Sequence, residues 1–143
     1  MKLTGSFAQL AKLRAGLERL EQQGVEAVAE AGATALRKVV DAQYERGKGP
    51  DGQRWAPLAS GEASHLTDTH EMRDTTTVVH GVRGITTRMS GKRGQARFHQ
   101  RGTKKTPARP LVPETDAPLP QSWAEPLQKA GTTALTKLLK KQT

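Results

Sequence analysis

The sequence predicts an α+β fold with long N-terminal helices, a small antiparallel sheet and a C-terminal helix. Three observations support this prediction. Apolar residues recur at helical spacing over residues 1–46 and again over 114–143. Runs rich in β-branched residues, separated by glycines, lie between them in 75–102. The length of 143 residues fits a single domain spanning 1–143.

Residues 1–46 are predicted to be helical. In SFAQLAKLRAGLERLEQQ, the residues Leu10, Leu13, Leu17 and Leu20 follow one another at steps of three and four and form one apolar stripe. We expect Gly24 to loosen or break the helix, so that a second helix begins after it. Glycines at 47 and 49 are suited to end that second helix.

Residues 47–74 are predicted to form a loop and a short helix. Pro50-Asp51-Gly52 is a turn, because proline presets φ, aspartate bonds its own backbone and glycine accepts a positive φ. Trp55 and Leu58 follow the turn and are predicted to point inward as packing anchors. The stretch LTDTHEMRDTT then gives the short helix or turn.

Residues 75–113 are predicted to form a three-stranded meander followed by an extended connector. The strands are expected at 75–82, 84–90 and 95–102, and Phe98 in the third is a further packing anchor. Prolines keep the connector extended. The C-terminal helix in 114–143 carries Trp123 as its main anchor, and Pro126 fits best in its first turn.

The net charge of +9 lies entirely in residues 75–113, which hold nine Lys or Arg and no acidic residue. Such a block predicts contact with an anionic partner, with a solvated mobile loop as the alternative. The candidate contact residues are Arg97 and Arg101 of the third predicted strand and Lys104, Lys105 and Arg109 of the connector. Prolines flank Arg109, so we expect it to reach a neighbouring carboxylate or phosphate, and Arg109→Glu to block assembly without unfolding the chain.

Most catalytic and cofactor chemistry has no support in the sequence. There is no cysteine, and the histidines and carboxylates lack metal-ligand spacing. No catalytic, cofactor-binding or metal-binding residue is therefore predicted, and His99 is expected to bond a neighbouring backbone group. No apolar run is long enough to span a membrane, and no signal peptide is evident.

Several short motifs occur in one order along the chain. They are GKGPDGQRWAPL, LTDTHEMRDT, FHQRGT and TPARPLVP. This order resembles the phage virion morphogenesis family, the tail-completion proteins of phages such as Mu and P2, and is similar to the small neck proteins of siphophages. The resemblance covers roughly residues 25–140.

The family's motifs fall on particular residues of this chain. The Asp-Gly, Trp and Leu element corresponds to Asp51, Gly52, Trp55 and Leu58, and the next element to Leu66, Thr69, Met72, Arg73 and Asp74. The last two correspond to His99, Gln100 and Gly102, and to Pro107–Pro110. The chain departs from the pattern at His70, where glycine is usual, and in a short stretch between Trp55 and Leu66.

The resemblance implies a structural virion protein at the head–tail junction, assembled in the bacterial cytoplasm. It implies a homo-oligomeric ring, often a hexamer, around the DNA channel, with the tail terminator, tail tube or sheath and head connector as partners. The residues leave a second function open, a non-specific nucleic-acid-binding module that uses 75–113. Phe98 is the single aromatic residue in the predicted sheet, which disfavours base stacking.

Overall fold

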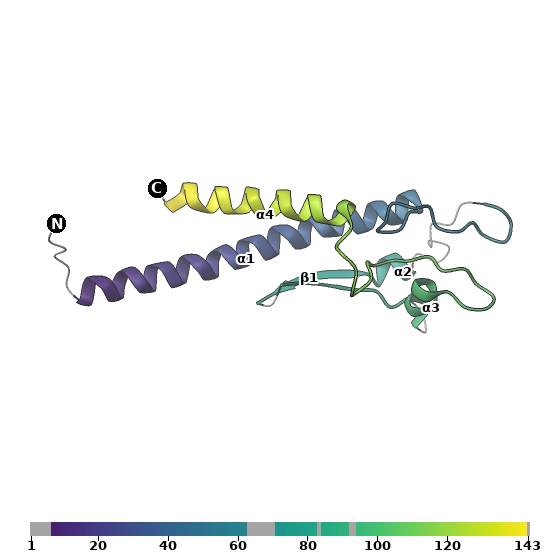
Figure 1. Cartoon of the computed structure of the whole chain (residues 1–143), viewed down its shortest axis with the longest axis horizontal. Helices are drawn as coiled ribbons and strands as arrows, with labels where there is room; N and C mark the ends of the chain where they lie inside the picture. Colours follow the sequence, from purple (N-terminus) through teal and green to yellow (C-terminus); the bar gives the residue numbers. More distant parts are fainter. Residues whose placement is uncertain (1–6, 63–70, 83, 92–93, 143) are drawn as a thin grey trace.

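The computed structural model describes residues 7–62, 71–82, 84–91 and 94–142, and its architecture is α+β, as predicted. Two long helices, α1 and α4, run side by side in opposite directions, and a β-hairpin and two short helices lie on one side of them (Figure 1). The chain is elongated, because α1 is much longer than every other element (Figure 1).

Helix α1 spans Phe7–Arg46 without interruption, so the predicted break at Gly24 is wrong. Gly24 is buried, and a Cβ added there would lie 3.5 Å from Leu135 of α4. The glycine therefore serves a close helix–helix contact. The helix ends where Gly47 takes a φ of 60°, as the sequence predicted for this position.

Helix α4 spans Gln121–Gln142 and packs antiparallel to α1. Small residues on one helix face large residues on the other at successive turns. Added Cβ atoms would lie 3.4 Å from Leu127 at Gly32, 3.3 Å from Val28 at Gly131, and 3.5 Å from Leu135 at Gly24. The missing side chains let the two backbones approach each other, which fixes the relative position of the helices.

Pro126 lies in the second turn of α4, not in the first turn as predicted. The helix begins at Gln121, where the amides of Trp123 and Ala124 both donate to the carbonyl of Pro120, at 2.9 and 2.8 Å, so Pro126 is its sixth residue. Trp123, in the first turn, is buried in the core.

The sheet has two strands, not three, among the described residues. β1 (Thr77–Gly81) pairs antiparallel with β2 (Gly84–Arg88), with Val79 opposite Thr86. The predicted third strand is helix α3, Gln95–Arg101. This run contains no β-branched residue and is rich in Gln, Ala and Arg, which favour helix. Gly94, with φ 73°, turns the chain out of β2 and into α3.

The core lies where α1, α4, the hairpin and the loops meet. Its buried residues come from every part of the chain: Leu36, Val40, Tyr44, Trp55, Met72, Ala96, Leu111 and Trp123. The rings of Tyr44 and Trp55 meet edge to face, with centroids 5.9 Å apart. Burial raises the pKa of the Tyr44 phenol, whose oxygen lies 2.9 Å from the Thr76 hydroxyl oxygen.

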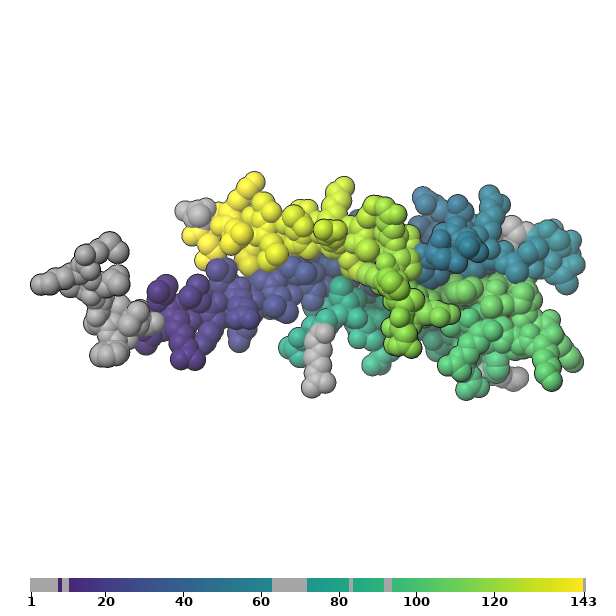
Figure 2. Space-filling model, viewed as in Figure 1, coloured from purple at the N-terminus to yellow at the C-terminus, as the bar shows by residue number. Residues whose placement is uncertain are grey.

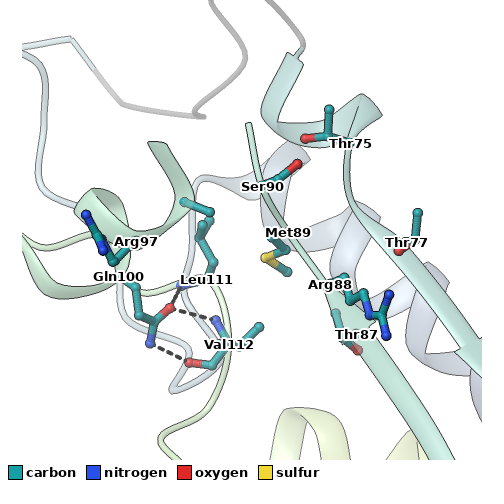
Figure 3. A pocket seen from close by; sticks show the side chains of 11 residues that line it. Thr75, Thr77, Thr87, Arg88, Met89, Ser90, Arg97, Gln100, Leu111 and Val112 are labelled. Atoms are coloured by element: carbon teal, nitrogen blue, oxygen red, sulfur yellow. Dashed lines mark hydrogen bonds between the residues drawn. The ribbon is translucent and has the colours of Figure 1, made fainter. Parts of the chain in front are cut away.

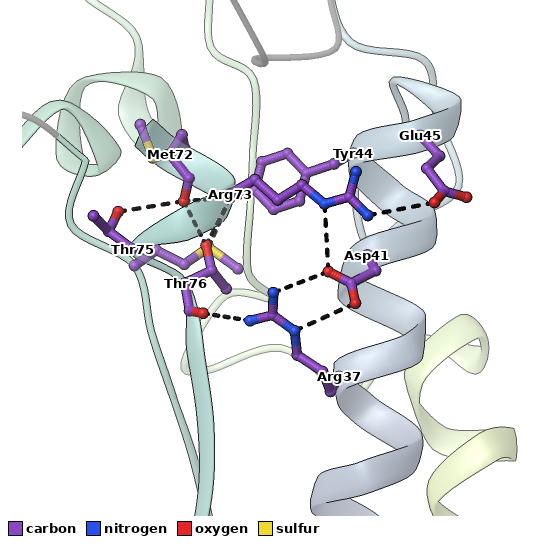
Figure 4. Close-up of polar contacts among 9 residues, drawn as sticks. Arg37, Asp41, Tyr44, Glu45, Met72, Arg73, Thr75 and Thr76 are labelled. Atoms are coloured by element: carbon purple, nitrogen blue, oxygen red, sulfur yellow. Dashed lines mark hydrogen bonds and ion pairs between the residues drawn. The ribbon is translucent and has the colours of Figure 1, made fainter. Parts of the chain in front are cut away.

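An ion-pair network fixes helix α2 (Glu71–Asp74) and the start of β1 to α1 (Figure 4). Asp41 lies 3.1 Å from the Nη2 of Arg37 and 3.6 Å from the Nε of Arg73, and Arg73 also reaches Glu45 at 3.4 Å. Arg37 donates a further hydrogen bond to the carbonyl of Thr76. Two of the resemblance motif residues, Met72 and Arg73, therefore have structural contacts.

Several predicted positions lie outside the described residues: Leu66, Thr69 and His70 of the second motif, and the basic residues Arg83, Lys92 and Arg93. Among the helices that the structure describes, none is both long and apolar enough to cross a lipid bilayer.

Candidate interaction surfaces

Arg109 is not a surface charge, which corrects the sequence prediction. Only 6% of the residue is exposed. Its Nε donates to the carbonyl of Ala56 at 2.7 Å and its Nη2 to the carbonyl of Pro57 at 2.8 Å. The planar guanidinium thus binds two adjacent backbone oxygens of the loop that follows α1. Arg109→Glu is therefore expected to damage the fold itself.

The connector that contains Arg109 is fastened at two more points. The Trp55 Nε1 donates to the carbonyl of Pro110 at 2.8 Å. The side-chain amide of Gln100 accepts from the amides of Leu111 and Val112, at 2.8 and 3.1 Å, and donates to the carbonyl of Val112 at 2.9 Å. Motifs that are far apart in the sequence thus converge on one cluster, which holds the connector against the core.

A glutamine that sequence reasoning missed joins this cluster to both long helices. Gln43 of α1 is buried, donates to the carbonyl of Leu111 at 3.1 Å and accepts from the Trp123 Nε1 at 2.6 Å. The only signal in the sequence was a polar residue within an apolar helix face next to Tyr44. Trp55 and Trp123 are each 5% exposed and belong to the core, as expected of packing anchors.

His99 is half-buried on α3, and among the described residues no hydrogen bond or ion pair joins its side chain to a carboxylate. Its Nδ1 is buried with no hydrogen-bond partner among the described residues, so the expected side-chain bond to the backbone is not made at this atom. Its carbonyl instead accepts from the Arg109 amide at 2.6 Å. The pKa of His99 is lowered, mainly by burial and to a smaller extent by the positive charge of Arg109.

The other predicted contact residues do lie on the surface. Arg97, Arg101, Lys104 and Lys105 are exposed on α3 and the start of the connector. Phe98 is 46% exposed, which contradicts its predicted role as a packing anchor, and Arg97 lies 5.3 Å from its ring centroid. Leu58 is half-buried. The exposed cations and the aromatic ring form one basic surface on α3 and the connector.

A hollow of about 680 Å³ lies between this surface and the base of the β-hairpin (Figure 3). Arg97 lies on the side of α3, and Arg88 and Thr77 lie across from it on the hairpin (Figure 3). Met89, Leu111 and Val112 supply its apolar wall.

Part of the predicted apolar stripe of α1 is exposed and does not pack against the rest of the described chain. Leu13 and Leu17 are 61% and 59% exposed, and Leu135 and Leu139 of α4 are also exposed. Figure 2 shows α4 lying directly along α1. The exposed leucines make this helix pair a candidate surface for contact with another protein.

Within the described residues, no group of three or more His, Cys, Asp or Glu is placed to hold a metal ion. Comparison of the chain with family models, curated proteins and solved structures gives no match.

Proposed function

We propose that the chain is a non-enzymatic structural protein of a phage neck. It completes the tail and helps to join the tail to the head, as part of a homo-oligomeric ring around the DNA channel at the head–tail junction. Its proposed partners are other copies of itself, the tail terminator, the tail tube or sheath, the head connector and, without sequence preference, the packaged DNA.

One observation carries this proposal. Three of the four motifs that resemble the virion morphogenesis family, separated in the sequence, make direct contacts around a single cluster. Trp55 bonds Pro110, Arg109 bonds the backbone after Trp55, and Gln100 bonds the residues after Pro110. Motifs that jointly build one structural element support a shared fold better than motifs scattered over unrelated surfaces.

Two further features support an assembly role. The core is small for the length of the chain, and several leucines on α1 and α4 are exposed. Subunits of this kind gain stability when they associate. The basic surface on α3 and the connector provides a second contact for an acidic protein or for DNA phosphates.

The proposal is tested in the phage that encodes the chain. Deletion of the gene is expected to leave DNA-filled heads and complete-length tails unjoined in electron micrographs. Addition of the purified protein to such a lysate should restore joined particles. Normal joined particles from the deletion would refute a neck function.

The exposed cations Arg97, Arg101, Lys104 and Lys105 favour a second candidate, non-specific binding of duplex nucleic acid. Gel shift with random-sequence duplex DNA over a range of salt concentrations separates the two. Tight binding by a monomer, with a steep loss of affinity as salt rises, would favour the nucleic-acid function. Salt-insensitive or absent binding, with discrete oligomers by native mass spectrometry, would favour the neck function.

A further inference from the structure

The basic surface on α3 and the connector carries charge that the rest of the subunit does not neutralise. It holds four exposed cations: Arg97, Arg101, Lys104 and Lys105. Among the described residues, no acidic side chain forms an ion pair with any of them. The acids nearest in the sequence are Asp74 and Glu114, since residues 75–113 contain none. The four positive charges are therefore available to a partner outside the subunit.

Hydrogen bonds fix the backbone that carries these cations. In the turn after α3, the Thr103 hydroxyl accepts from the amides of Lys105 and Thr106, at 3.2 and 3.0 Å. The Thr103 amide also donates to the carbonyl of Thr106 at 2.8 Å. The Arg109 amide then donates to the carbonyl of His99 at 2.6 Å, so the connector folds back onto α3. Because this backbone is ordered before a partner binds, binding costs less conformational entropy.

The exposed leucines of the long helices lie far from this surface. Helix α3 is at the end of the molecule away from the start of α1 and the end of α4 (Figure 1). Leu13 and Leu139 belong to those terminal parts and are 61% and 55% exposed. Within the described residues 94–109, Phe98 is the one large apolar side chain left exposed, and the Arg97 guanidinium carbon lies 5.3 Å from its ring centroid. The basic surface therefore lacks the apolar centre typical of a protein–protein interface.

The composition of the basic surface suits phosphate groups better than an acidic protein. Two of the four cations are lysines, which are depleted at protein–protein interfaces but commonly contact nucleic-acid phosphates. A DNA duplex presents one negative charge per about 1.7 Å of its axis, so neighbouring cations can each meet a phosphate without a specific register. Single-stranded DNA is bound by several aromatic rings that stack on successive bases, and one exposed ring therefore favours the duplex backbone as the ligand.

We propose that the basic surface binds the backbone phosphates of duplex DNA without reading the base sequence. Its arginines and lysines pair with phosphate oxygens and release the counterions bound to them. In a ring, each subunit then turns α3 towards the DNA channel, and the exposed leucines at the other end of the molecule lie farther from the DNA. This inference rests on the proposed function, in which packaged DNA is one partner, and names the surface that makes that contact.

The test compares two variants of the full chain that lose the same charge. The basic-surface variant replaces its four cations by glutamine: Arg97→Gln, Arg101→Gln, Lys104→Gln and Lys105→Gln. The control variant replaces four exposed cations of α1 and α4 in the same way: Lys12→Gln, Arg19→Gln, Lys137→Gln and Lys141→Gln. Among the described residues, neither set takes part in an ion pair, so both variants should fold like the wild type. Circular dichroism checks their helix content and melting temperature.

Fluorescence anisotropy with a labelled random-sequence DNA duplex measures the binding, at salt concentrations from about 50 to about 200 mM. With four phosphate contacts per subunit, the affinity of the wild type should fall about 100-fold or more over this range. At about 50 mM salt the basic-surface variant should bind at least about tenfold more weakly than the wild type, with a smaller salt dependence. The control variant should stay within about threefold of the wild type, because charges more than about 10 Å from the DNA are largely screened.

Three results would overturn the inference: a wild type that binds no duplex at low salt, a basic-surface variant that binds like the wild type, or a control variant that loses as much affinity. If the wild type binds no duplex and the basic-surface variant fails to restore joined particles in the lysate, the partner of this surface is an acidic protein instead. The proposed function fails separately. If DNA binding depends on the basic surface but the wild type does not restore joining, the DNA contact stands and the neck function does not. If the wild type restores joining without binding DNA, the neck function stands and the DNA contact does not.

Discussion

Replacement of Arg109 by methionine should destabilise the subunit, because this side chain is a structural element. The change keeps most of the volume and removes the guanidinium that binds the carbonyls of Ala56 and Pro57 at 2.7 and 2.8 Å. A hydrogen bond from a charged donor contributes about 1.5–3 kcal/mol. Pro57 is exposed, so water replaces part of what its carbonyl loses. The expected loss of unfolding free energy is therefore about 2–4 kcal/mol.

Urea unfolding followed by tryptophan fluorescence measures this loss, since Trp55 directly precedes Ala56 and Trp123 lies in the same core. With a slope of about 2 kcal/mol per molar urea, the midpoint should fall by about 1–2 M. Arg109→Lys should lie between the wild type and Arg109→Met, because one ammonium cannot bind both carbonyls with the geometry of the fork.

Arg97→Met is the matched control, because Arg97 is exposed, and it should change stability by no more than about 0.5 kcal/mol. An unchanged midpoint for Arg109→Met, combined with loss of self-association or DNA binding, would refute the structural role. It would restore Arg109 as an interface residue.

Three further changes test other parts of the fold. Trp55→Ala should lower the free energy of unfolding by about 3–5 kcal/mol, measured by thermal or urea unfolding, because the ring is buried and its Nε1 donates to the carbonyl of Pro110. An unchanged melting temperature would show that Trp55 does not pack in the core. Gly24→Ala should stabilise the chain by up to about 1 kcal/mol, because the new Cβ would meet Leu135 at ordinary contact distance in a continuous helix; a loss of helix in circular dichroism would contradict this. Lowering the pH from 7 should weaken the fold through His99, because its folded pKa lies below the unfolded value of 6.5 and the unfolded chain therefore binds more protons. The stability that the neutral His99 contributes is complete above pH 6.5 and is lost as the pH falls through the folded pKa. The urea midpoint of the wild type should therefore fall more on acidification than that of His99→Asn.

Local periodicity was sufficient to predict the main helices and the hairpin. The steps of three and four in α1 and α4 and the β-branched runs before Ser90 each depend on residues close together in the chain. The tryptophans were also predictable as core residues, because large aromatic side chains are rarely left in water. The confinement of the excess positive charge to 75–113 was visible from counting alone.

Two predictions of secondary structure were wrong, for different reasons. Gly24 was expected to break a helix, but Leu135 lies against it, and the close contact outweighs the low helix propensity of glycine. Residues 95–102 were expected to form a strand because they followed two others. Their helix formers and the turn at Gly94 direct them into α3.

The candidate interaction surfaces were predictable only in part. Arg97, Arg101, Lys104 and Lys105 are exposed as expected, whereas Arg109 in the same run is buried. Pro107 and Pro110 flank it in the sequence, and no local pattern shows that it binds the carbonyls of Ala56 and Pro57, more than fifty residues away. A groove that lies between α1 and α4 was not predictable either, since its two walls come from distant parts of the chain.

By itself the sequence determined the class of fold, the helical character of both ends of the chain, the two core tryptophans and the location of the positive charge, because these follow from the period and composition of neighbouring residues. Only the tertiary structure decided that Arg109 is buried and hydrogen-bonded while Arg97 and Arg101 are exposed. It also decided why Gly24 is tolerated within α1 and which leucines stay exposed. Each of these depends on partners far away in the chain, whose positions are set only when α4 and the connector pack against α1.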